Sequence, residues 1–209
     1  MSAAVNATAS DQYRGLMSNI RARFEIIDGL GLGGESEYAP LETAAFHLRK
    51  SIEAATFGCL IAMENGLRKV PRDAKGQWNA DKLLTKVKKG NPPVFPVAIH
   101  AEEPQPGSVG IAHHIVTNKE WNLSIDEVRQ IYRRTHKWLH EWNPYLPGGP
   151  LKFGKYRDEL IDDIPKVWRW LLHHLISVDG EVFIAVLKRS PDVGVEIISA
   201  SANAYEAQQ

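Results

Sequence analysis

The segment 41–65 constrains the fold of this chain most, because a single helical stripe of apolar residues runs through it. The stripe has members three or four positions apart: Leu41, Ala45, Leu48, Ile52, Ala55, Cys59 and Met63. Pro40 suits the first turn of a helix, and Gly66 is a natural residue to end one. A long helix with one apolar face needs partners to cover that face, which favours a helical bundle.

Further helices are expected on both sides of this segment. The first runs over residues 11–28 and ends at a cluster of glycines, and a short basic helix follows the N-cap Asn79 as far as Lys89. Residues 91–110, rich in proline and glycine, predict an irregular excursion. Further along, a short helix is expected over 155–162 and another from Pro165 that carries Leu175 on its apolar side.

Two strands, 181–188 and 193–200, with turn residues between them, complete the expected order. The predicted fold is therefore mainly α, a helical bundle with a C-terminal β-hairpin at about residues 181–200. We expect one domain over residues 11–202, with flexible tails at 1–10 and 203–209, which are rich in small and polar residues.

Bulk composition excludes several classes of protein. With 44% apolar residues among 209, the chain can build one substantial core, and 25 basic residues balance 25 acidic ones. There is then no global positive field to capture nucleic acid, so a site for a polyanion must be a local patch. A single cysteine, Cys59, and the absence of a signal peptide or membrane-spanning stretch predict a cytoplasmic protein without membrane association.

The segment 124–142 carries the most informative polar residues. Ser124 and Glu127 form a capping-box pattern, and the apolar stripe that follows is Ile125, Val128, Tyr132, Thr135, Leu139 and Trp142. A second stripe lies beside it at 100° per residue: Arg129, Arg133, His136 and His140. Arginine matches a phosphate with its fork of donors, and histidine exchanges protons near neutral pH, so this stripe suits phosphodiester chemistry.

The same angular count separates the two adjacent arginines. Arg133 lies about 20° from His140 around the helix axis and Arg134 about 120° away, which favours Arg133 as the partner of His140. An alternative is an ordinary polar flank whose charges pair with carboxylates. Another alternative is a metal ion held by His136 and His140, with its ligand shell completed from His113, His114, Asp162 or Asp163. Because the sequence contains no metal-binding motif, no metal or other cofactor is expected.

Three short segments resemble HEPN-domain proteins. Residues 133–140, RRTHKWLH, resemble the R-x(4–6)-H motif of that family; residues 47–53, HLRKSIE, are similar to an LRK-x-x-E helix in several HEPN-like groups. Residues 139–145, LHEWNPY, are similar to an LH-x-x-NP segment. The chain departs from the commonest pattern after each arginine, where Arg134 and Thr135 replace a polar Asn, Asp or His.

The resemblance implies a small helical bundle that acts as a metal-independent endoribonuclease, in a toxin–antitoxin or anti-phage system, and that forms a homodimer. In that reading His140 transfers the proton, Arg133 or Arg134 stabilises the phosphorane, and Asn143 or His136 orients the phosphate. Arg129 would support RNA binding, together with Arg49 and Glu53, which lie one turn apart. A cognate antitoxin or other protein partner is implied as well.

The alternative function is a non-catalytic HEPN-like module that binds a protein partner, a nucleotide or RNA through the basic stripe. An exposed tryptophan can stack on an unpaired base, but most tryptophans of this chain are expected to be core residues, with Trp121 and Trp170 the better candidates for exposure. The lysines of residues 82–89 are expected to form a solvated helix face.

Overall fold

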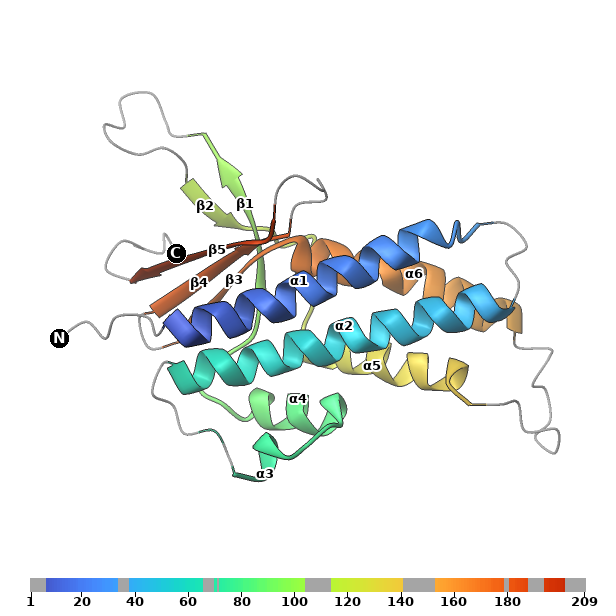
Figure 1. The fold of residues 1–209 in the computed structure, drawn as a ribbon, viewed down its shortest axis with the longest axis horizontal. Helices are drawn as coiled ribbons and strands as arrows, with labels where there is room; N and C mark the ends of the chain where they lie inside the picture. The colour runs from blue at the N-terminus through green and yellow to red at the C-terminus, as the bar shows by residue number, and fades with distance from the viewer. Residues whose placement is uncertain are drawn as a thin grey trace.

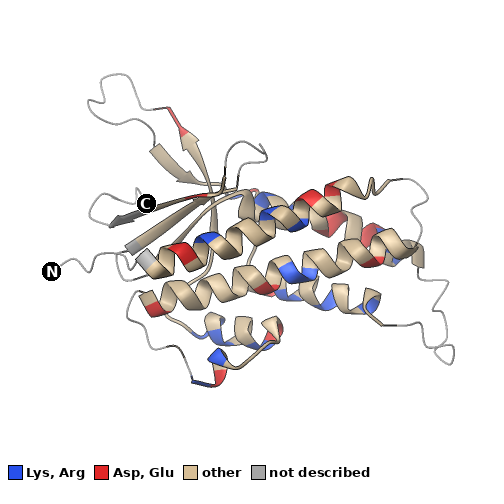
Figure 2. Ribbon diagram, viewed as in Figure 1, with Lys and Arg blue, Asp and Glu red and all other residues tan. Residues whose placement is uncertain are grey.

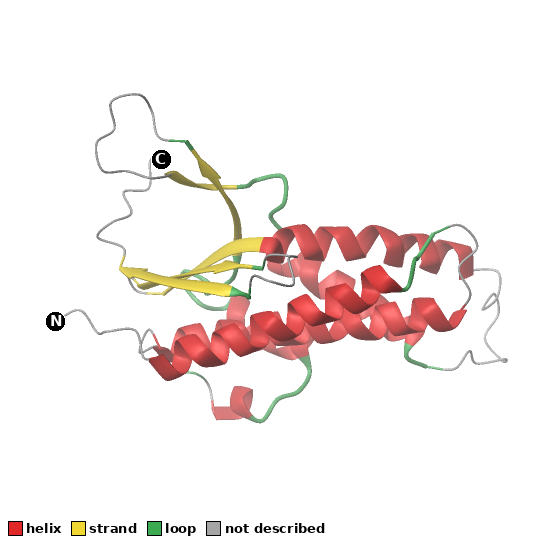
Figure 3. Cartoon of the chain, turned by 45° about the horizontal axis from the view of Figure 1, so that its top comes forward, coloured by secondary structure: helices red, strands yellow, loops and turns green. Residues whose placement is uncertain are grey.

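A computed structural model describes residues 7–33, 38–65, 70, 72–103, 114–140, 153–178, 181–187 and 194–201. The helices in these residues are α1 (Ala7–Gly29), α2 (Tyr38–Asn65), α3 (Arg72–Lys75), α4 (Ala80–Lys88), α5 (Ile125–Thr135), the 3-10 turn η1 (His136–Trp138) and α6 (Phe153–Leu172). The strands are β1 (Val97–Glu102), β2 (His114–Thr117), β3 (His173–Val178), β4 (Glu181–Val186) and β5 (Glu196–Ser201). The fold is mainly helical, as predicted, with an antiparallel sheet at one end of the helices (Figures 1 and 3).

Helices α1 and α2 lie side by side and form the centre of the helical part (Figure 1). The predicted stripe of α2 is buried over most of its length, with Leu41, Leu48 and Ile52 fully covered. On α1, the fully buried side chains Tyr13, Met17 and Ile20 recur every three or four residues. Helices α5 and α6 contact α2 and each other and complete the core.

The N-terminal boundary of the first helix was predicted wrongly. Helix α1 begins at Ala7, so the expected tail of residues 1–10 overlaps its first turn, where Ala9 is already buried. Alanine is the best helix former, and its methyl group is covered at no cost in side-chain entropy, so the helix extends into this small-residue segment. The expected tail at 203–209 lies outside the described residues.

The expected hairpin is only part of a five-stranded antiparallel sheet with the order β2-β1-β3-β4-β5. Strand β1 lies within the segment predicted to be irregular, and it pairs with β2 and also with β3 through Val97 and Leu175. Strand β3 occupies residues that were assigned to a helix. Its alternate side chains His174 and Ile176 are buried, which is the periodicity of a strand that packs on a core.

Pro165 does not begin a new helix, because it lies inside the continuous helix α6. Proline removes one backbone donor and normally interrupts a helix. The buried face of α6, however, continues across it from Leu160 to Val167, Trp168 and Leu171. Burial on both sides of Pro165 therefore keeps the two predicted segments in one helix.

Candidate functional site

Helix α5 begins as the sequence predicts. The Ser124 amide donates to Glu127 Oε2 over 2.8 Å, and the Glu127 amide donates to Ser124 Oγ over 3.2 Å, so both halves of the capping box are present. Four of the predicted apolar residues, Ile125, Val128, Tyr132 and Thr135, are buried.

The end of this helix was predicted wrongly. The α-helix stops at Thr135, and residues 136–138 form a 3-10 turn in which the His136 amide donates to the carbonyls of both Arg133 and Arg134. Trp138 is buried beside Tyr38 and Phe153, with ring centroids 5.6 and 5.7 Å away, and these contacts fix the turn. His140 therefore follows the helix instead of belonging to it, and residues 141–142 lie outside the described part of the chain.

The basic residues of α5 lie on two flanks of the helix. Arg129 Nε and Arg133 Nη2 donate to the two carboxylate oxygens of Asp81 on α4, over 2.8 and 3.0 Å. Burial of Asp81 opposes its ionisation, but hydrogen bonds from Arg133 and Arg129 outweigh this effect and lower its pKa. These two arginines thus serve to join α5 to α4, where acidic and basic positions are mixed (Figure 2).

Arg134 lies on the other flank, as the angular count predicts. Its Nε and Nη2 donate to the two oxygens of Asp163 on α6, both over 2.7 Å. The Asp163 side chain is 3% exposed, and this bidentate hydrogen bonding raises the pKa of Arg134. Both arginines of the R-x(4–6)-H pattern are therefore bound to carboxylates, which is the arrangement expected of a polar flank.

The two histidines of the pattern contact each other. The rings of His136 and His140 are 4.3 Å apart between centroids and nearly perpendicular, and both residues are exposed. Partial removal of water from His136 lowers its pKa, and the neighbouring His140 and Arg49 lower it further. The guanidinium whose charge acts on His136 therefore comes from α2.

Arg49 belongs to a cluster centred on Tyr132. Its guanidinium carbon lies 3.9 Å from the centroid of the Tyr132 ring, and its Nε is 3.3 Å from Glu53 Oε1. The Tyr132 hydroxyl donates to Glu53 Oε1 over 3.1 Å and accepts from Arg49 Nη2 over 2.5 Å. Burial and then the Glu53 carboxylate raise the pKa of Tyr132, so the phenol stays protonated and joins α2 to α5.

Sequence reasoning missed three residues of this region. Tyr132 was assigned only to the apolar stripe, and the carboxylates Asp81 and Asp163 were not recognised as partners of the arginines. The sequence shows Tyr132 in one predicted helix and the i, i+4 pair of Arg49 and Glu53 in another, but the contact between them depends on the tertiary fold.

The expected exposure of the tryptophans was wrong for Trp170, which is 1% exposed and donates from Nε1 to the Pro96 carbonyl over 3.0 Å. Trp121 is partly buried. Among the described tryptophans the most exposed is instead Trp78, at 82%, which the sequence pattern did not single out. Among the lysines of α4, Lys86 pairs with Asp73 and Lys88 with Asp126, so this helix face is ion-paired.

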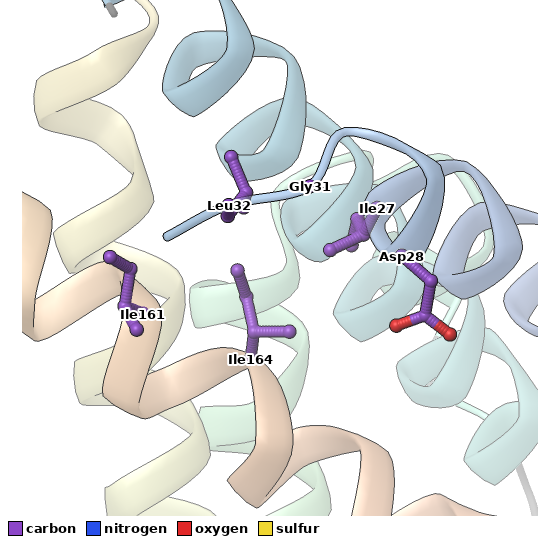
Figure 4. Close-up of a pocket in the computed structure, with 6 residues that line it drawn as sticks. All are labelled: Ile27, Asp28, Gly31, Leu32, Ile161 and Ile164. Carbon is purple, nitrogen blue, oxygen red and sulfur yellow. The ribbon is translucent and has the colours of Figure 1, made fainter. Parts of the chain in front are cut away.

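Among the described residues, no group of three or more His, Cys, Asp or Glu side chains is placed to hold a metal ion; His113 and Asn143 lie outside that part of the chain. A pocket of about 250 Å³ lies between the end of α1 and α6, lined by Ile27, Asp28, Gly31, Leu32, Ile161 and Ile164 (Figure 4). It contains none of the candidate residues. No described helix is both long and apolar enough to cross a bilayer.

Comparisons with models of protein families, with curated proteins and with solved structures gave no match to this chain.

Proposed function

We propose that this chain is a metal-independent endoribonuclease that uses His136 and His140 to transfer protons and Arg49 to bind the phosphate. The observation that carries the proposal is the contact between two exposed imidazoles, 4.3 Å apart, within the electrostatic reach of a guanidinium. Two adjacent histidines can supply a general base and a general acid without a metal ion.

The chemistry follows from the lowered pKa of His136, which keeps this imidazole neutral and able to accept a proton. His136 accepts the proton of the RNA 2′-hydroxyl, whose oxygen attacks the adjacent phosphorus. The bond to the 5′-oxygen breaks, and protonated His140 gives that oxygen its proton. The products are a 2′,3′-cyclic phosphate and a 5′-hydroxyl end, and Arg49 stabilises the charge on the phosphorane.

The resemblance to HEPN proteins supports this proposal but requires a different arginine. In the motif reading, Arg133 or Arg134 stabilises the phosphorane; each has a carboxylate partner within 3.0 Å, as Arg49 has in Glu53 at 3.3 Å. The choice of Arg49, from the LRK-x-x-E segment, rests on the effect of its charge on His136. The proposal retains a HEPN-like bundle, a homodimer and a role as a toxin or anti-phage effector, with a cognate antitoxin as the regulating partner.

A second candidate is a non-catalytic HEPN-like module that binds RNA, a nucleotide or a protein partner. The observation that favours it is the pairing of both motif arginines with Asp81 and Asp163, because a neutralised guanidinium contributes less to charge stabilisation in a transition state. The two candidates differ in one respect that is directly measurable: only the first changes its ligand covalently.

The test is incubation of single-stranded RNA with purified protein in EDTA, followed by detection of cyclic phosphate ends. We expect His136→Ala and His140→Ala each to slow cleavage by about 100-fold or more, which is the usual contribution of one acid or base. His114→Ala removes another exposed histidine, on β2, and serves as the matched control that retains activity. Equal cleavage by all four proteins, or none by the unaltered chain, would rule out the nuclease; binding without cleavage would favour the module.

A further inference from the structure

Trp78 is an exposed aromatic residue in a structured position. Its side chain is 82% exposed, more than Ile198 at 51% or Ile26 at 45%. It immediately precedes Asn79, whose side chain caps α4 by accepting from the amides of Asp81 and Lys82. The indole edge contacts Phe57 of α2, with ring centroids 6.4 Å apart at 81°. The backbone and one edge of Trp78 are thus held while its ring remains open to solvent.

Helix α2 connects Trp78 to the histidine pair. Arg49, Glu53 and Phe57 are four residues apart, so they lie on successive turns of one face of α2. This row spans about 12 Å at 1.5 Å per residue. Phe57 contacts Trp78 at one end, and Arg49 acts on His136 at the other.

Helix α4 provides a second connection between the same two points. Asp81, three residues after Trp78, accepts from Arg133 over 3.0 Å, and His136 follows Arg133 by three residues. Along α2, the residues that act on Trp78 and on His136 are about 12 Å apart. That is the length of about three to four stacked nucleotides at about 3.4 Å each.

Basic and acidic side chains are mixed between these two points, with a small excess of positive charge. The cations Arg49, Lys50, Arg129 and Arg133 pair with three carboxylates, Glu53, Asp81 and Asp126. Arg133 is 57% exposed and keeps donors free for a phosphate after bonding one oxygen of Asp81.

We propose that Trp78 stacks on an unpaired base, so that the substrate is single-stranded RNA whose backbone crosses the Arg49–Arg133 region to the histidine pair. This inference rests on the proposed function and names its substrate class. A base of a duplex has both faces covered by its neighbours, whereas an unpaired base offers a face to an aromatic ring. A single exposed indole suits a nucleotide, since protein-binding patches are apolar at their centre.

The test measures binding of a fluorescein-labelled, 2′-O-methylated 12-nucleotide RNA, which cannot be cleaved because its 2′-oxygens are blocked. We expect Trp78→Ala to weaken binding by about 5- to 100-fold, as alanine substitution at a stacking site does. Trp78→Phe keeps an aromatic face and should recover most of the loss. Ile198→Ala, which removes an exposed apolar side chain on β5, is the matched control and should bind like the unaltered chain.

Annealing the same RNA to its complement should remove the difference between Trp78→Ala and the unaltered chain. Equal binding of single strands by these two proteins would overturn the inference. So would a change in oligomeric state of Trp78→Ala without RNA in sedimentation, which would make Trp78 an interface between copies. Cleavage by the unaltered chain in EDTA is measured separately, so a failed stacking site and a failed nuclease give different results.

Discussion

Protonation of His174 is expected to destabilise the fold as the pH falls below about 6.5. This residue of β3 is fully buried, and its Nδ1 lies 2.8 Å from the Leu171 carbonyl oxygen. A carbonyl oxygen only accepts, so Nδ1 carries the proton, and Nε2 accepts from the Tyr13 hydroxyl over 2.6 Å. The structure thus holds the neutral imidazole.

The magnitude follows from the difference between the folded and unfolded pKa. Burial lowers the pKa of His174 to about 4, opposed by its bond to Leu171, whereas an unfolded histidine has a pKa of about 6.5. Between these values the unfolded chain binds more protons than the folded one, so stability rises with pH. The contribution of His174 to the free energy of unfolding is fully present above about pH 6.5. It falls by about 2 kcal/mol between about pH 7.5 and 5.

Urea unfolding at a series of pH values measures this change. Because other groups also titrate in this range, the comparison is with His174→Gln, whose amide does not ionise, and the difference in slope isolates His174. Independently of any variant, the ring resonances of His174 in the unaltered chain should stay at their neutral positions down to about pH 5. Titration of this ring near pH 6.5, or identical pH slopes for both proteins, would refute the reasoning.

Two further substitutions test packing and charge pairing. Arg134→Ala leaves the Asp163 carboxylate buried without its partner and should lower the free energy of unfolding by about 2–3 kcal/mol, a loss that urea titration resolves; a change below about 0.5 kcal/mol would contradict the role of this pair. Gly58→Ala places a Cβ 2.9 Å from Tyr13 Cε2 and should cost about 1–2 kcal/mol. Gly15→Ala, whose added Cβ meets no atom within 4 Å, is the control and should stabilise the fold by up to about 1 kcal/mol. Stabilisation of the fold by both alanine substitutions would disprove the steric overlap between residue 58 and Tyr13.

The parts of the fold that were predicted correctly depend on local rules. The N-cap at Asn79, the capping box at Ser124 and the apolar stripe of α2 each involve residues within a few positions of one another. Strands β1 and β3 pair with each other across 76 to 78 residues, and nothing near either segment indicates that the other lies beside it. Their nearer partners β2 and β4 did not reveal them, because prolines and glycines of residues 91–110 predict a loop and the apolar pattern of α6 continues to Leu175. The start of a helix was predicted at Pro165 for the opposite reason. The local rule that proline begins or interrupts a helix was overridden there by burial of α6 on both sides of the proline.

The candidate site was predictable in its angular arrangement but not in its contacts. Helical geometry placed Arg134 apart from Arg129 and Arg133, and their different carboxylate partners agree with this. Which carboxylates they meet depends on how α4 and α6 pack against α5, and sequence spacing carries no information about that packing. The same is true of Trp78, because whether a tryptophan is covered depends on elements distant in the chain.

The contact between Tyr13 and the sheet has a consequence for the order of events during synthesis. Besides its bond to His174, Tyr13 stacks on Phe183 with centroids 5.6 Å apart, so the first helix packs on strands encoded 161 to 170 residues later. At about 5–20 residues per second, the ribosome needs about 10–30 s to make the intervening chain. The α1–α2 pair can form in that interval, but the sheet-facing side of α1 stays exposed, and a chaperone that covers apolar helices would protect the nascent chain until β4 is complete.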